Sequence, residues 1–228
     1  MSTITSMNKL SSPIKLIQDS IKIFFDKKNL LYLALIYSVL VPLQVASYFI
    51  GSPVDPSTGN IKNPTLFAVY LVVGILYILI SLLVSVAGVA AVKRVVSGGA
   101  LNIKETFSFA LKNLWNFLLL SSLVFLAVLG GTILLVIPGI IFGIWFSFAK
   151  FVFIDQGLPI KASMAKSHDL VRGRFWAVLG RLFVFGLFGS LVGAIVSAIP
   201  FDIGSILVAL AGGLFMLPVF LLYKELNG

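Results

Sequence analysis

Long apolar stretches separated by short polar and basic segments dominate this chain. The clearest stretch runs from Leu114 to Ile154, about forty residues in which Lys150 is the only charge. A helix needs about 20 apolar residues to cross roughly 30 Å of hydrocarbon, so this stretch is about twice as long as one crossing requires. Near its middle lies the motif Ile137-Pro138-Gly139, whose residues favour a turn. The pattern therefore predicts two membrane-spanning helices joined at Pro138 and Gly139.

A hydropathy window of about 19 residues predicts six spans along the whole chain. They are Leu30 to Ile50, Thr65 to Val92, Leu114 to Ile137, Ile140 to Ile154, Ala177 to Ile199, and Ile203 to Tyr223. The fourth is the shortest, and a re-entrant helix is the alternative to a full crossing there. The expected fold is an all-α membrane bundle of six transmembrane helices in three hairpins, with a second short outer turn at Pro200-Phe201-Asp202.

A weakly amphipathic, basic segment precedes each predicted hairpin, which indicates a threefold repeat. These segments are Lys9 to Asp26, Asn102 to Lys112, and Pro159 to Val171. Apolar residues of the first recur every three or four positions, as expected for a short helix lying in the head-group plane. In the second, Asn102 and Glu105 have the spacing of a helix N-cap pair. The alternative is that these are the ordinary basic joins of any multi-pass protein.

The distribution of basic residues predicts the orientation of the chain. Lys62 is the one base in a predicted outer connection, and the other 16 of the 17 lie on the opposite side. Because Lys and Arg resist translocation, both termini are expected in the cytoplasm of a multi-pass protein of the inner membrane. The net charge of +9 then belongs to the cytoplasmic side, where it favours anionic lipid head groups. Nucleic acid is a poorer partner, because no recognised binding module carries the charge.

Composition supports a membrane protein with one domain. The chain has 59% hydrophobic and 11% charged residues, and its mean hydropathy is +1.10. No polar stretch is long enough for a separate soluble domain, so residues 1–228 are expected to form one membrane domain that starts with a cytoplasmic segment at 1–28. There is no cysteine for a disulfide or a thiolate site. Residues 1–26 lack the continuous apolar core of a secretory signal.

Small residues at helical spacing predict where the spans pack against one another. A four-residue spacing in a membrane helix lets two backbones approach closely. The residues are Ser81, Ser85, Gly186, Gly189, Gly193 and Ser197. A substrate path lined by small side chains is the functional alternative. Gly130-Gly131 and Gly212-Gly213 fit either hinges or close contacts.

Coupled transport and catalysis are both disfavoured by the residues that the spans contain. No Asp or Glu falls within the body of a predicted span, where ion-coupled transport usually places one. The single histidine, His168, has no second His and no Cys to form a metal site, so no metal or cofactor is expected. Phosphate-loop, nucleophile-elbow and paired-carboxylate motifs are not found.

Four basic residues are candidates for contact with a lipid head group. Lys150 and Arg181 lie about one helical turn inside predicted spans, and the simpler interpretation is that both side chains extend to the interface. The sharper hypothesis is that Arg181 joins Arg172 and Arg174 to hold a lipid phosphate between helices.

Residues 134–190, about a quarter of the chain, resemble a known family. The resemblance is carried by Ile137-Pro138-Gly139-Ile140-Ile141, Trp145-Phe146-Ser147-Phe148-Ala149, Asp155-Gln156-Gly157, Lys161-Ala162-Ser163-Met164-Ala165-Lys166-Ser167, Leu170-Val171 and Arg174-Phe175-Trp176. These motifs are similar to the bacterial membrane-domain family associated with glycerophosphoryl diester phosphodiesterases, and to the related YciC-type inner-membrane proteins. The resemblance implies a six-helix module without catalytic or binding residues of its own. Phosphodiesterase activity in that family belongs to a separate soluble barrel, which has no counterpart here.

The sequence therefore predicts a non-enzymatic membrane protein that organises anionic lipid or a partner protein through a basic cytoplasmic face. A transporter or channel for a small or lipidic substrate is the alternative, and a lipid-modifying membrane enzyme comes third.

Overall fold

The computed structural model describes residues 10–50, 53–55, 57, 60–61, 63–199 and 203–228, and the regular elements of this part are all helices, apart from an isolated bridge between Val54 and Ile61. The elements are α1 (Pro13–Phe25), α2 (Lys27–Tyr37), the 3-10 turn η1 (Ser38–Leu40), α3 (Val41–Ile50), α4 (Pro64–Val96), α5 (Ile103–Leu134), α6 (Val136–Trp145), α7 (Ala149–Gln156), α8 (Ile160–Val171), α9 (Phe175–Ser197), α10 (Ile203–Leu210) and α11 (Gly212–Asn227). The all-α class predicted from the sequence is confirmed.

Six apolar helical stretches among the described residues are long enough to cross a membrane. They are Lys27–Ala46, Pro64–Val96, Ile103–Leu134, Val136–Gln156, Phe175–Ser197 and Ile203–Asn227. Large apolar side chains are exposed along the first half of α4 and the second half of α5. Such continuous apolar surface requires lipid as its solvent. The chain is a multi-pass membrane protein.

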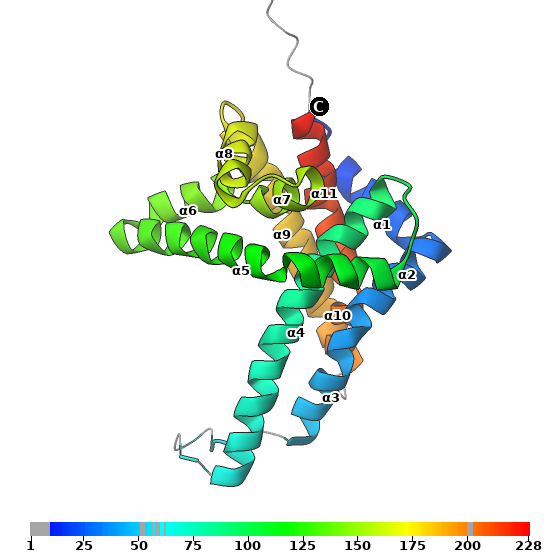
Figure 1. Cartoon of the computed structure of the whole chain (residues 1–228), viewed down its shortest axis with the longest axis vertical. Helices are drawn as coiled ribbons and strands as arrows, with labels where there is room; N and C mark the ends of the chain where they lie inside the picture. The colour runs from blue at the N-terminus through cyan, green and yellow to red at the C-terminus, as the bar shows by residue number, and fades with distance from the viewer. Residues whose placement is uncertain (1–9, 51–52, 56, 58–59, 62, 200–202) are drawn as a thin grey trace, which may run out of the picture.

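The helices diverge from a shared centre. In Figure 1, α3 and the first half of α4 extend toward the lower end and α10 lies below the centre, whereas α1, α8 and the end of α11 lie in the upper half. The hairpin of α5 and α6 extends to the left, away from α4. α4 and α5 have 33 and 32 residues and are each about 50 Å long, which is more than the roughly 30 Å of hydrocarbon that a span must cross.

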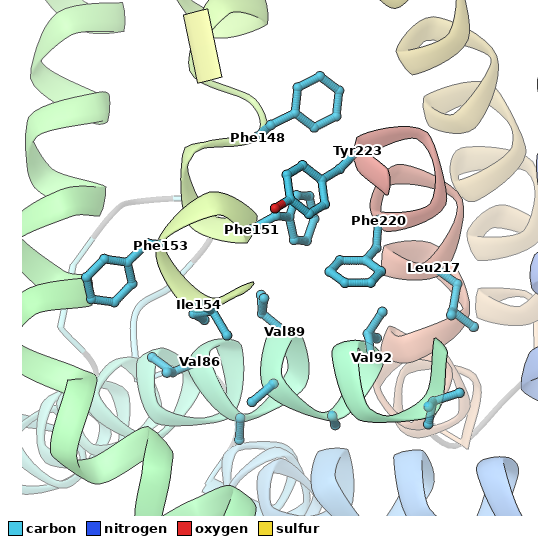
Figure 2. Packing of buried hydrophobic residues seen from close by; sticks show 14 of the residues in the cluster. Val86, Val89, Val92, Phe148, Phe151, Phe153, Ile154, Leu217, Phe220 and Tyr223 are labelled. Atoms are coloured by element: carbon cyan, nitrogen blue, oxygen red, sulfur yellow. The ribbon is translucent and has the colours of Figure 1, made fainter. Parts of the chain in front are cut away.

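One continuous core joins the helices where they converge. The second half of α4 is buried from Val84 to Val92, and α7 and α11 pack over it. Figure 2 shows aromatic rings of α7 and α11 meeting above the valines of α4. The ring centroids of Phe151 and Phe220 are 5.5 Å apart with nearly perpendicular planes, a favourable aromatic geometry.

The second amphipathic segment is not a separate helix, contrary to the prediction. Residues 103–112 form the first turns of α5, which continues without a break to Leu134. The predicted N-cap is confirmed, because the side chain of Asn102 accepts a hydrogen bond from the backbone N of Glu105 at 3.2 Å. Nothing between residues 112 and 114 interrupts the helical hydrogen bonds, so the basic segment and the span share one axis.

The turn between the third and fourth spans lies earlier than predicted. Leu135 alone separates α5 from α6, and its backbone is extended. Pro138 and Gly139 lie in the first turn and a half of α6. Proline is tolerated there, because the first backbone N–H groups of a helix have no partner within it. Gly139 instead packs against Thr132 of α5, with no room for a side chain between them.

The other two amphipathic segments form the separate helices α1 and α8. Asp26 ends α1 and caps α2, accepting hydrogen bonds from the backbone N of Lys28 and of Asn29. Leu16 and Phe24 are buried where α1 packs on α11. The placement of α1 in the head-group plane stays a prediction. The predicted turn at Pro200-Phe201-Asp202 lies outside the described residues.

Candidate functional site

A break in the fourth span positions the candidate site. The chain leaves α6 after Trp145 and enters α7 at Ala149, so some backbone groups at this break have no helical partner. Ser167 of α8 satisfies two of them: its Oγ donates to the carbonyl of Trp145 at 2.7 Å and accepts from the backbone N of Phe148 at 3.2 Å. This buried hydroxyl fixes α8 against the end of α6.

A tight turn then brings α9 beside the same place. Gly173 has φ +78°, a left-handed conformation that glycine adopts without strain. The backbone N of Arg172 donates to the carbonyl of His168, and that of Arg174 to the carbonyl of Val171, both at 2.9 Å. The turn therefore holds Arg172 between the end of α8 and the start of α9.

These elements enclose a groove of about 410 Å³ between α6, α8 and α9. We call it the α8–α9 groove. Its lining residues are Ile141, Trp145, His168, Arg172, Gly173, Phe175 and Trp176. The rings of Trp145 and His168 meet edge to face with centroids 4.7 Å apart, and the side of the groove at Trp176 is open, since this residue is 80% exposed. Two indoles and a guanidinium thus surround a space with an apolar floor.

The charge of the groove is positive. No carboxylate belongs to its lining, and the side chain of Arg172, an exposed residue, makes no hydrogen bond or ion pair with another described residue. The nearest acid to the lining along the chain is Asp169, whose Oδ1 lies 3.4 Å from Nδ1 of His168. Two other cavities at basic residues contain acids: Glu105 lies with Arg94, Lys104 and Lys112 in one, and Asp19 and Glu225 lie with Lys22 and Lys224 in the other.

The structure does not gather all four predicted basic residues at this groove. Arg172 lines it, and Arg174 precedes the first residue of α9. Lys150 is on α7, where its Nζ lies 5.1 Å from the ring centroid of Phe151.

Arg181 holds the start of the described chain. Its Nε donates to the carbonyl of Ser11 and its Nη2 to the carbonyl of Leu10, both at 2.9 Å, while Nη1 donates to Ala177 within α9. The backbone N of Ser11 also donates to the carboxylate of Glu225. Arg181 therefore attaches residues 10 and 11 to α9, and the lipid contact expected of it stays a prediction.

A polar cluster around Asp155 was not predicted as a site. The carboxylate of Asp155 is 9% exposed and accepts from Tyr223 Oη at 2.9 Å and from Lys224 Nζ at 2.8 Å. Nζ of Lys93 lies 3.4 Å from the same carboxylate, and Gln156 donates to Tyr223. The cluster ties α4, α7 and α11 together. Its sequence signal is an acid at the end of one span matched by lysines at the ends of two others.

The small residues predicted to pack helices differ in their surroundings. A Cβ added at Gly186 or Gly193 would meet no atom within 4 Å, and at Gly189 it would make ordinary contact with Phe215 at 3.5 Å. The hydroxyls of Ser81 and Ser197 donate to carbonyls of their own helices, and Ser85 is half-buried on α4. Closer approaches lie at Gly88, Gly139 and Gly204, and at Gly131, Gly212 and Gly213 of the two Gly-Gly pairs, for which hinges or close contacts were expected.

Neither a metal-binding group nor a known relative assigns a function to this site. Among the described residues, no group of three or more His, Asp or Glu could hold a metal ion. Comparison with family models, curated proteins and solved structures finds no match for this chain.

Proposed function

We propose that this protein binds the phosphate of an anionic lipid in the α8–α9 groove. The observation that supports this most directly is Arg172, which lines the groove together with two indoles and whose guanidinium has no protein partner among the described residues. A guanidinium presents paired N–H donors that match phosphate oxygens. Basic residues near an anionic membrane surface each contribute about 1 kcal/mol to attraction at low salt.

The aromatic residues suit the same ligand. Indole rings prefer the boundary between head groups and acyl chains, with the ring in contact with apolar groups and the N–H near water. Trp176 and Trp145 would contact the glycerol and upper acyl region, while Ile141 and Phe175 form an apolar floor for the chain. The groove thus offers one cationic and one apolar part to an amphiphilic ligand.

The proposed role is binding or organising lipid, and not catalysis. Apart from Arg172, His168 is the only ionisable side chain in the lining, and Asp169, the acid beside it, lies outside the lining, so the lining itself holds no acid–base pair. The family resemblance of residues 134–190 implies a non-catalytic module as well. We place the groove at the cytoplasmic leaflet of the inner membrane with both termini inside, because basic residues concentrate at that end of the helices.

Binding of defined lipids to the purified full chain tests the proposal. Native mass spectrometry would compare dioleoylphosphatidylglycerol with dioleoylphosphatidylcholine for the unmodified chain, Arg172→Gln and Lys161→Gln. Lys161 is an exposed residue of α8 outside the groove lining, so it is the matched charge control. We expect Arg172→Gln to weaken phosphatidylglycerol binding about tenfold, the loss of one charge-assisted contact.

Lys161→Gln should leave the affinity nearly unchanged, because an exposed charge outside the groove contributes only screened attraction. Equal affinities of both variants for phosphatidylglycerol would contradict the proposal, as would equal binding of the two lipids by the unmodified chain. Arg181 is unsuitable for this test, since its replacement would release residues 10 and 11.

A further inference from the structure

A second cavity lies at the opposite end of the helices from the α8–α9 groove. It has a volume of about 380 Å³ between α3, α4 and α10, whose labels lie in the lower half of Figure 1. Its lining residues are Leu43, Gln44, Tyr70, Val73, Gly74, Tyr77 and Ser205. We call it the α3–α4–α10 cavity. It is separate from the groove proposed above, because the two share no residue.

One face of α4 forms a wall of this cavity. Tyr70, Val73, Gly74 and Tyr77 are spaced by three, four and seven residues, so they lie along one stripe of the helix. Seven residues rise about 10 Å, which separates the two tyrosines by that distance along the axis. Gly74 lies between them, and a Cβ there would meet no atom within 4 Å. This face of α4 therefore carries a phenol at each end and, at Gly74 between them, open space with no side chain.

The polar groups of the cavity carry no charge. Each of them can donate and accept hydrogen bonds: the two phenols, the amide of Gln44 and the hydroxyl of Ser205. No acid or base belongs to the lining, so the cavity offers nothing to neutralise an ion. Its chemistry suits a ligand with several hydroxyl or ester oxygens.

The depth of the cavity favours a ligand that arrives from the bilayer. Tyr70 and Tyr77 are six and thirteen residues from the start of α4, which places them about 9 and 20 Å along the helix. Neither phenol oxygen has a hydrogen-bond partner among the described residues, although both tyrosines lie on a candidate span. They are 42% and 36% exposed. Water is absent from the hydrocarbon region, so a polar group there is stabilised strongly by a ligand that offers it a hydrogen bond.

We propose that the α3–α4–α10 cavity binds the uncharged glycerol-ester end of a diacylglycerol-type lipid. The hydroxyl and ester oxygens would exchange hydrogen bonds with Tyr70 and Tyr77, the glycerol carbons would lie over Gly74, and the acyl chains would leave through the exposed side of the tyrosines. The site differs from the α8–α9 groove in charge and in position along the helices. It requires neither that groove nor its phosphate ligand.

The proposal can be tested by filling the open space at Gly74 with a side chain that does not clash with its neighbours. Gly74→Leu places an apolar side chain in the open space, and Gly193→Leu is the matched control on α9, where a Cβ also has open space outside the cavity. A third variant, Tyr70→Phe with Tyr77→Phe, removes both hydroxyls and keeps the ring volumes. Native mass spectrometry of the full chain would use dioleoylglycerol, dioleoylphosphatidylglycerol and free glycerol as probes. Thermal unfolding would confirm that each variant is folded.

We expect the unmodified chain and Gly193→Leu to bind dioleoylglycerol alike. Gly74→Leu and the double phenylalanine variant should each bind it at least about tenfold more weakly. The proposal is overturned if the unmodified chain does not bind dioleoylglycerol, or if Gly74→Leu binds it as Gly193→Leu does. It is also overturned if free glycerol binds equally well, which would identify a soluble polyol as the ligand. If Gly74→Leu does not fold, equal binding by the double variant and the unmodified chain overturns it.

Discussion

The ring of Tyr37 between two glycines allows a precise test of the helix packing. Tyr37 is buried at the end of α2, between Gly88 of α4 and Gly212 of α11. A Cβ at Gly88 would lie 2.5 Å from the Tyr37 oxygen and 3.1 Å from ring carbon Cζ. A Cβ at Gly212 would lie 2.5 Å and 2.7 Å from ring carbons Cε1 and Cδ1. The ring cannot shift away from one glycine without approaching the other.

The replacement Gly88→Ala should therefore destabilise the chain. Ordinary van der Waals contact begins at 3.4 Å, so the new methyl group would overlap the Tyr37 oxygen by about 1 Å. Overpacking of this size costs about 1–3 kcal/mol, of which the better helix propensity of alanine recovers up to about 1. In a Tyr37→Phe background the oxygen is absent, and the closest atom is the ring carbon at 3.1 Å. The cost of Gly88→Ala should then fall by at least about 1 kcal/mol.

The matched control is Gly212→Ala, whose clash is with ring carbons that phenylalanine retains. Its cost should be the same in both backgrounds within about 0.5 kcal/mol. Equilibrium unfolding in mixed detergent and SDS micelles would measure the unmodified chain and the five variants of the two cycles. An equal cost of Gly88→Ala with Tyr37 and with Phe at this position would refute the predicted packing. In addition, Tyr37→Phe alone should be neutral or stabilising, because the Tyr37 oxygen is buried with no hydrogen-bond partner among the described atoms.

Three further predictions concern the polar cluster, the hairpin and the orientation. Asp155→Asn should lower the free energy of unfolding by about 1–3 kcal/mol in the same assay, because it leaves two lysines without their shared carboxylate. The control Glu105→Gln should lower it by less than about 0.5 kcal/mol, because Glu105 is 58% exposed. Equal losses in the two variants would contradict this. Gly139→Ala should lower the melting temperature by forcing α6 away from α5, and Gly143→Ala, which has open space on the same helix, should not. The chain has no cysteine, so Ser57→Cys provides a unique label, and an impermeant maleimide should modify it in intact cells; modification only after lysis would reverse the proposed orientation.

Hydropathy predicts the spans well because lipid imposes the same requirement at every position. Backbone groups in hydrocarbon must be paired within a helix, so an apolar run of sufficient length has few alternatives. All six predicted spans overlap a candidate span in the structure. The ends of helices are less constrained, since proline fits both a turn and the first turn of a helix. This explains why Pro138 and Gly139 lie inside α6 and Leu135 forms the connection.

The candidate site depends on contacts between distant residues, and periodicity does not contain them. Arg172 and Arg181 both belong to a basic stretch, yet one lines the α8–α9 groove and the other bonds the carbonyls of Leu10 and Ser11. Ser167 interrupts the apolar stripe of α8, and only the break between α6 and α7 explains why a hydroxyl is needed there. Similarly, the small-residue spacing on α9 does not indicate that the ring of Tyr37 packs closely against Gly88 and Gly212.

Quenching of tryptophan fluorescence by brominated lipid tests the central proposal most directly. The chain has three tryptophans, and Trp115→Phe leaves only Trp145 and Trp176, which both line the α8–α9 groove. In vesicles with equal mole fractions, brominated phosphatidylglycerol should quench this variant more strongly than brominated phosphatidylcholine, because in the proposed complex Arg172 holds the anionic lipid beside the indoles. Adding Arg172→Gln should remove the difference. Equal quenching by the two lipids in the variant that retains Arg172 would contradict the proposed binding of anionic lipid.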